Sequence, residues 1–234
     1  MARRKGKSRG WRFSIVMAVV LGLALAAAWY WWTMRSWAPP EDAYPDQGVA
    51  LAPGQYQQRF ETVSALGAKF AYFSLGAIGE QPDPSLSEAM AQARAAGLQT
   101  GAQLSFDPCA PADPQSARFV TMVARDPALL PPAIALGRDA ANCDDPVSDA
   151  AVESELMTLI NQIEGHAGKP VILKLSRGFE ERFSIASKVN RDLWVLGDRF
   201  APRYAGRPWL LWSANGTRHI VGADEPLEWV VVQP

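Results

Sequence analysis

The chain begins with one long apolar segment and continues, after residue 47, as short apolar runs alternating with amphipathic stretches. Residues 13–32 contain no charged side chain, and the last four of them are aromatic. A helix rises ~1.5 Å per residue, so about 20 residues cross the ~30 Å hydrocarbon core of a bilayer. Aromatic side chains gather at membrane–water interfaces. The pattern therefore predicts a transmembrane helix over residues 13–32.

Basic residues crowd the chain before this helix and are scarce after it. Residues 1–12 contain Arg3, Arg4, Lys5, Lys7, Arg9 and Arg12. Because positive charge stays on the cytoplasmic side, we expect a signal-anchor that crosses the inner membrane once. The N-terminus is then cytoplasmic and the C-terminal domain periplasmic or extracellular. A cleaved signal peptide, with Ala26-Ala27-Ala28 as its small-residue site, is the alternative, but the long apolar core and the aromatic cluster favour the anchor.

Residues 33–46 predict a linker, because they combine Ala38-Pro39-Pro40 with acidic residues. The folded domain is expected over residues 47–234. Short apolar runs predict strands at 48–51, 69–75, 100–106, 132–136, 171–175, 193–196, 210–213 and 229–232. Apolar spacing of three and four residues predicts helices at 55–66, 85–96, 115–125 and 152–167.

Strands and helices alternate through most of the domain, but no long helix separates the last strands. Alternation predicts parallel strands covered by helices. About eight strands favour a compact, irregular β/α barrel whose last part lacks helices. An open doubly wound sheet is the alternative, although no glycine-rich phosphate-binding sequence follows the first strand. Asn215-Gly216 predicts a hairpin turn between late strands.

Composition limits the chemistry. A formal net charge of −1 gives no reason to expect a nucleic-acid partner. Cys109 and Cys143 in an exported domain predict a disulfide, with two buried thiols as the alternative. His166 and His219 lie far apart without ligands at metal-binding spacing, and no Gly-x-Ser-x-Gly sequence is present. We therefore expect no metal, no cofactor and no serine-hydrolase site.

Six segments of the domain carry a family resemblance. They are Gly48-Val49-Ala50-Leu51, Gly67-Ala68-Lys69-Phe70-Ala71-Tyr72, residues 93–102, Leu130-Pro131-Pro132-Ala133, Leu193-Trp194-Val195 and Trp209-Leu210-Leu211-Trp212. In order and spacing they resemble glycoside hydrolase family 25, the lysozyme-type muramidases. The resemblance implies an irregular barrel with a groove that binds peptidoglycan. It also implies cleavage of the bond between N-acetylmuramic acid and N-acetylglucosamine.

The chain departs from that family where the chemistry is carried. The first-strand aspartate corresponds to Ala50, and the fourth-strand Asp-x-Glu corresponds to Ala135 and Gly137. Glu228 retains the acidic position near the C-terminus. Because glycoside hydrolysis needs two carboxyl groups, we expect impaired catalysis and leave open whether the domain is an enzyme.

Asp139 offers a displaced second carboxylate. In a strand, the period of two would place residues 135, 137 and 139 on one face, so that Asp139 faces Glu228 as a catalytic partner. The plainer interpretation is a loop residue beside Arg138, since charged loop residues are usually exposed.

Gln103 and Trp212 are the expected substrate-binding residues. Gln103 corresponds to an active-site position at the end of the family's third strand, where this chain continues with Leu104. Trp212 corresponds to a region that borders the groove, and indole rings stack on sugars. The other late tryptophans, Trp209 and Trp229, are expected in the core.

Three functions follow from these observations. The first is a membrane-anchored, catalytically impaired module that binds peptidoglycan glycan or a cell-envelope protein. The second is an active muramidase that uses Asp139 and Glu228. The third is a periplasmic scaffold that has kept only the fold, since a fold alone does not fix a function.

Overall fold

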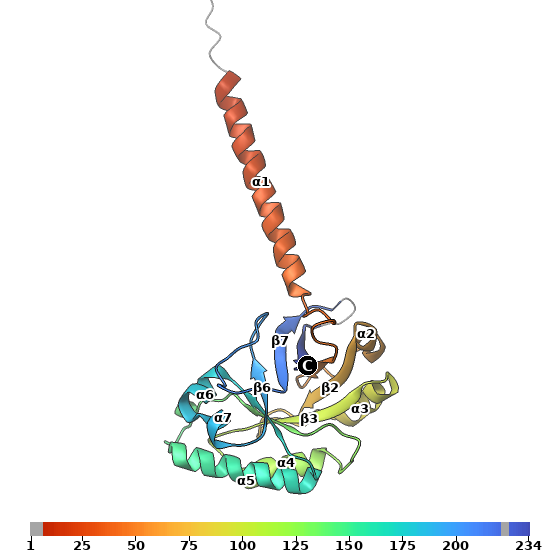
Figure 1. Cartoon of the computed structure of the whole chain (residues 1–234), viewed down its shortest axis with the longest axis vertical. Coiled ribbons are helices and arrows are strands. Elements are labelled where there is room, and N and C mark those ends of the chain that lie inside the picture. Colours follow the sequence, from red (N-terminus) through yellow and green to blue (C-terminus); the bar gives the residue numbers. More distant parts are fainter. Residues whose placement is uncertain (1–6, 221–224) are drawn as a thin grey trace, which may run out of the picture. The chain divides into compact units, whose positions relative to one another are not determined.

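The computed structural model describes residues 7–220 and 225–234 (Figure 1). Clustering of contacts divides the chain into two compact units, with the boundary after Trp37. Helix α1 (Lys7–Arg35) makes up the first unit as far as it is described. Its segment Phe13–Arg35 is long and apolar enough to cross a membrane, a property that signal sequences share. Arg3, Arg4 and Lys5, which belong to the predicted cytoplasmic N-terminus, lie outside the described residues.

The second unit is built around a closed barrel of eight strands in sequential order. The strands are β1 (Gln47–Leu51), β2 (Ala68–Ser74), β3 (Gln99–Ser105), β4 (Ala133–Leu136), β5 (Ile172–Leu175), β6 (Asp192–Leu196), β7 (Leu211–Arg218) and β8 (Leu227–Val232). Neighbours from β1 to β7 pair in parallel, whereas β8 runs antiparallel to both β7 and β1. The predicted irregular β/α barrel is confirmed, and the doubly wound alternative is wrong because the sheet closes.

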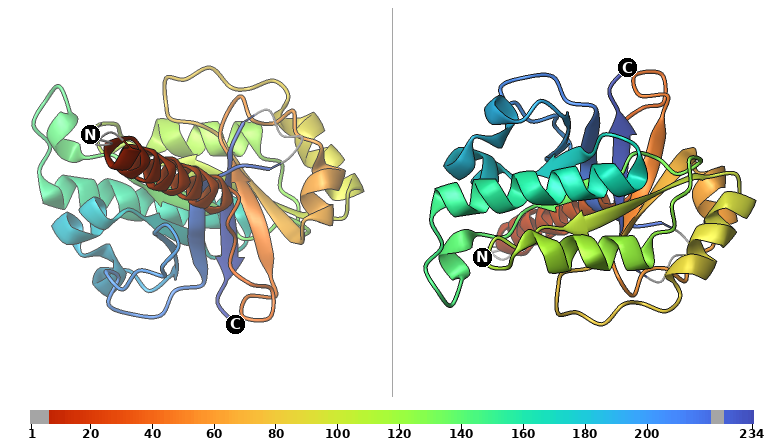
Figure 2. Two further views of the ribbon diagram at one scale, coloured as in Figure 1. Left: turned by 90° about the horizontal axis from the view of Figure 1, so that it is seen from above. Right: turned by 90° about the horizontal axis from the view of Figure 1, so that it is seen from below.

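Helices cover the barrel at the crossovers between β1 and β6, whereas the crossover from β6 to the parallel β7 is a loop. The helices are α2 (Phe60–Ala65), α3 (Leu86–Ala95), α4 (Ala112–Met122), η1 (Ala140–Asn142), α5 (Asp149–Ala167), α6 (Arg177–Phe183) and α7 (Ile185–Lys188). Figure 2 shows α4 and α5 side by side on one wall of the barrel. In the described part of the chain after α7 there is no helix. An antiparallel strand returns through a loop and needs no crossover helix, which accounts for the bare wall at β8.

Helix α5 illustrates how local sequence fixes an element. The Ser148 hydroxyl accepts a hydrogen bond from the backbone N–H of Ala151 at 3.2 Å, which caps the first turn. Gly168 then adopts a left-handed φ of 67° and ends the helix. Between these ends, apolar side chains at helical spacing are buried against the barrel: Val152, Leu156, Leu159, Ile160 and Ile163.

Three local predictions need correction. The chain passes straight through Asn215-Gly216 as part of β7, with shifts of register on both sides of Asn215. Gly216 has no positive φ, so it cannot form the predicted hairpin turn, and its N–H instead donates to Asp198 at 2.8 Å. The helix predicted from residue 55 begins only at Phe60. The segment 38–46, predicted as linker, belongs to the compact barrel unit, where the Gln47 side-chain amide donates to the Pro39 and Tyr44 carbonyls.

Apolar side chains from several strands fill the barrel interior toward the amino-terminal ends of the parallel strands, and a glycine makes room for one of the rings. The cluster comprises Ala50, Phe70, Tyr72, Ala133, Ile172, Trp194, Leu211 and Val230. Tyr72 on β2 lies opposite Gly101 on β3, where an added Cβ would come within 2.5 Å of the Tyr72 ring. The Tyr72 hydroxyl donates to the Pro131 carbonyl at 3.0 Å, and burial raises the pKa of this phenol. The ring is therefore fixed at both ends.

Replacement of Gly101 by alanine is expected to lower the free energy of unfolding by about 1–3 kcal/mol, because the new methyl group overlaps a ring that cannot retreat. Urea unfolding of the full chain in detergent measures the change. The matched control is Gly165→Ala, at an exposed helical position with open space around it, which should stabilise the protein by up to about 1 kcal/mol. Equal stability of the wild type and Gly101→Ala would contradict the packing of Tyr72.

Candidate functional site

The candidate site lies inside the barrel at the carboxyl ends of the parallel strands, where β/α barrels concentrate their chemistry. Residues two apart in a strand point to the same face. Lys174 therefore points into the barrel as Ile172 does, and Ser213 points inward as Leu211 does. Because β8 runs antiparallel, its second residue, Glu228, reaches the same end. Gln103 of β3 completes the layer.

Hydrogen bonds join these side chains into one network. The Lys174 ammonium donates to Glu228 Oε2 at 2.7 Å and to Gln103 Oε1 at 3.1 Å. The Ser213 hydroxyl donates to Glu228 Oε1 and accepts from the indole N–H of Trp194 at 2.7 Å. Lys174 Nζ lies 4.3 Å from the centroid of the Trp194 ring. Lysine, glutamate, serine and tryptophan thus close a cycle in which each contacts the next.

The network neutralises its own charge. One ammonium faces one carboxylate, with the Lys174 side chain 7% exposed and that of Glu228 23% exposed. A charge buried without a partner is costly, whereas a pair with further hydrogen bonds is tolerated. Both Glu228 oxygens have donors, and the Lys174 ammonium has two acceptors and an aromatic face. The charges of Lys174 and Glu228 are therefore balanced, and their hydrogen bonds are made, within the cluster.

Removal of one partner should be costly. Lys174→Met and Glu228→Gln are each expected to lower the free energy of unfolding by about 3–5 kcal/mol, because each leaves a buried polar group without its partner. The double variant should lose less than the sum of the two by about 0.5–3 kcal/mol. Urea unfolding of the four proteins measures this coupling energy. Simple additivity would show that the pair is not coupled.

The positions that correspond to the family's other acids surround this network. Ala50 is buried and pairs directly with Glu228 across the β1–β8 ladder. Ala135 is partly buried and pairs with Lys174 across β4 and β5. Gly137 is exposed and follows the end of β4 at Leu136. Methyl groups at residues 50 and 135 thus adjoin the ion pair where carboxylates would repel or compete with Glu228.

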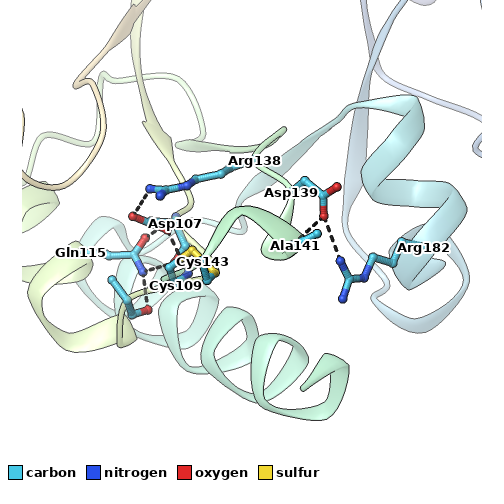
Figure 3. The surroundings of a disulfide bond; sticks show 9 residues. Asp107, Cys109, Gln115, Arg138, Asp139, Ala141, Cys143 and Arg182 are labelled. Carbon is cyan, nitrogen blue, oxygen red and sulfur yellow. Dashed lines mark hydrogen bonds and ion pairs between the residues drawn. A yellow bond between two sulfur atoms is a disulfide. The ribbon is translucent and has the colours of Figure 1, made fainter. Parts of the chain in front are cut away.

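Asp139 lies in a different environment from Glu228. Strand β4 ends at Leu136, so the assumption that residues 135, 137 and 139 share one strand face is wrong. Asp139 is an exposed N-cap of η1, and its carboxylate accepts from the Ala141 N–H and the Arg182 guanidinium, both at 2.9 Å (Figure 3). These bonds hold the pKa of Asp139 below its usual value, with the Ala141 bond as the largest cause. The partners of Asp139 and Glu228 do not overlap.

A disulfide ties the loops that follow β3 and β4. Cys109 and Cys143 are bonded as predicted, with a Cα–Cα distance of 5.3 Å (Figure 3). Beside the bond, the buried Asp107 carboxylate accepts from the Cys109 N–H at 2.9 Å and pairs with Arg138. Gln115 of α4 bonds to the Asp107 backbone in both directions, at 2.8 and 2.9 Å. The disulfide and the ion pair therefore fix the same two loops at the mouth.

Reduction of the disulfide is expected to lower the melting temperature by about 10 °C. The bond closes a loop of 34 residues, and the chain-entropy relation gives about 3–4 kcal/mol for a loop of that length. Circular dichroism with and without a reductant measures the shift. The control is the double variant Cys109→Ala, Cys143→Ala, whose melting temperature should not respond to reductant. A wild type that melts equally with and without reductant would show that the bond does not form.

The two expected substrate-binding residues lie on opposite faces of the barrel wall. Gln103 is 7% exposed and holds Lys174 in the interior. Trp212 is 3% exposed and lies on the outer face, where its ring packs edge-on against Tyr44 and Trp209 and its N–H donates to the Gly197 carbonyl at 2.5 Å. Its indole therefore has no open face in this structure. Trp229 is buried, as expected, while Trp209 is partly exposed.

Three residues of the network, Lys174, Ser213 and Trp194, were not predicted from the sequence. A single lysine within the apolar strand Val171–Leu175 was the available signal. A charge in a fully buried strand requires a partner. The partner, Glu228, lies 54 residues away in the chain, which no local pattern can identify.

A cavity of about 770 Å³ opens at the opposite, amino-terminal end of the barrel. Its walls are mostly apolar and include Phe70, Tyr72 and Leu211, with Lys69 and Asp46 as an exposed ion pair at the rim. Chemistry in β/α barrels gathers at the carboxyl ends of the strands. The polar network at that end is therefore the better candidate site.

Solved structures match this fold, whereas no family model and no curated protein matches the sequence. A family 25 glycosyl hydrolase from Bacillus anthracis superposes with a TM-score of 0.74 at 23% identity, covering 84% of this chain and 92% of the other. A bacterial lysozyme from Streptomyces coelicolor gives 0.69 at 16% identity, covering 81% and 92%. A family GH25 lysozyme from Aspergillus fumigatus gives 0.64 at 14% identity, covering 81% and 94%. The barrel unit therefore has the fold of the family 25 lysozymes and muramidases, as the sequence resemblance implied.

Proposed function

We propose that the domain binds the glycan strands of peptidoglycan without cleaving them, and that α1 anchors it in the inner membrane with the barrel outside. The observation that carries this proposal is the state of Glu228. Both oxygens of this carboxylate are bonded inside the barrel, one to Lys174 and one to Ser213. A carboxyl group that serves hydrolysis needs an oxygen directed at the scissile bond.

The pairing of the described acidic residues near the mouth with arginines strengthens the proposal. Glycosidases of this type use two carboxyl groups about 5–9.5 Å apart, on either side of the bond that breaks. Among the described residues near the mouth, Asp107 is paired with Arg138 and Asp139 with Arg182. Loss of general acid catalysis alone costs about 10²–10⁴ in rate. The combination supports binding as the retained activity.

The rim of the barrel offers side chains that can contact a polar ligand. Side chains that are partly exposed around the network belong to Ser74, Ser105, Ala135, Leu196 and Glu228. The hydroxyls of Ser74 and Ser105 are of the type that forms hydrogen bonds with sugar hydroxyls. The matching lysozymes and muramidases supply the analogy for the ligand class.

The test uses the full chain in mild detergent with purified, dye-labelled sacculi. We expect the protein to sediment with the sacculi and to release dye at least about 10²-fold more slowly than an active muramidase. The variants Glu228→Gln and Asp139→Asn serve as matched controls and should leave the background release unchanged. Dye release that is abolished by Glu228→Gln in a variant that circular dichroism shows to be folded would instead establish the active muramidase.

A protein scaffold is the second candidate, because the barrel interior is filled by the Lys174 network. A filled interior removes the deep groove that a glycan chain would enter. In that case the full chain should fail to sediment with sacculi freed of protein. Crosslinking in intact cells should then capture a protein partner at the barrel mouth. Retention on the protein-free sacculi would contradict the scaffold.

A further inference from the structure

The loop between β6 and β7 displays an aromatic ring to solvent. Phe200 is 82% exposed, more than any other large apolar side chain described in the barrel unit. Burial of a phenylalanine side chain is worth about 1.5–3 kcal/mol, so contact between a ligand and this ring would be favourable. Exposed aromatic side chains are a common mark of binding surfaces.

Backbone bonds hold this loop against β7. The N–H groups of Gly197 and Arg199 donate to the carbonyls of Ser213 and Ala214 at 3.3 and 2.7 Å. The Asp198 carboxylate accepts from the Gly216 N–H at 2.8 Å. The base of the loop is thus fixed on the strand that carries Ser213 of the central network.

The residue before Phe200 is strained. Arg199 adopts a positive φ of 66°, a conformation that non-glycine residues seldom occupy. Such residues persist where the surrounding contacts over-determine the backbone, and they cluster at ligand-binding sites. The Arg199 N–H bond to Ala214 is one of those contacts. The strain and the bonds together fix the backbone from which the Phe200 ring extends.

We propose that Phe200 is a stacking platform for a pyranose ring of the glycan strand, at the rim of the barrel mouth. This inference rests on the proposed function and names a residue that increases the affinity of the site for the glycan. The loop begins at the carboxyl end of β6, the same end as Glu228 and Lys174. A sugar ring presents C–H groups on its faces, and an aromatic face covers them.

A bilayer surface is a less suitable occupant. Segments that enter the membrane interface combine several large apolar side chains on one face. In the loop 197–204, Phe200 is the one large aliphatic or aromatic side chain that is mostly exposed, so the loop does not present several apolar side chains on one face. A single ring fits a single sugar better than a lipid surface.

The test compares binding of full-length variants to protein-free sacculi in detergent. Phe200→Ala should weaken binding about tenfold, while Phe200→Trp should stay within about threefold of the wild type, because the larger ring still stacks. The matched control is Val120→Ala, which removes a side chain that is 45% exposed on α4. It should bind like the wild type. Equal melting temperatures of all four proteins will show that the fold is unchanged.

The outcomes separate this inference from the proposed function. Wild-type binding with an equal affinity of Phe200→Ala would overturn the role of Phe200 and leave glycan binding intact. Failure of the wild type to bind would overturn both. Weakening by Phe200→Trp as large as that by Phe200→Ala would also overturn the stacking role, because it would point to a close fit of phenylalanine and not to an aromatic platform.

Discussion

The pairing of one ammonium with one carboxylate inside the barrel determines how the polar side chains at its mouth are arranged. Lys174 and Glu228 are brought together from β5 and β8, and neither could be buried alone at acceptable cost. Once paired, they recruit the remaining polar groups of that layer, Gln103, Ser213 and the Trp194 indole. The carboxyl end of the barrel interior is thereby occupied by a polar cluster. The alanines at 50 and 135 are compatible with this cluster, because carboxylates there would compete for the same lysine.

The barrel geometry makes the pair possible. Seven parallel strands bring their carboxyl ends to one rim, and the antiparallel β8 places its beginning there. A glutamate near the start of β8 therefore meets a lysine near the end of β5. The loops above the rim are fixed in turn by the Cys109–Cys143 disulfide and by the Asp107–Arg138 pair. The loops that follow β3 and β4 are therefore linked to each other by a covalent bond and by an ion pair.

Polar and aromatic groups are divided between the two faces of the wall. Trp194 points inward and bonds Ser213, whereas Trp212, on the next strand, packs outside against Trp209. The alternation of strand side chains decides which tryptophan belongs to the network and which to the outer packing. Phe200 belongs to neither, since it lies on a loop whose backbone is tied to β7. Its exposure thus depends on loop geometry and not on strand period.

The sequence by itself determined the features that depend on neighbouring residues. The uncharged segment 13–32 indicated an apolar helix, and the alternating periods indicated a β/α barrel. Only the tertiary structure decided that Lys174 neutralises Glu228, that β4 stops before Asp139, and that Asn215-Gly216 continues a strand. Each of these depends on contacts between residues far apart in the chain. Local propensity cannot supply them, because closure of the barrel selects partners by register and not by sequence distance.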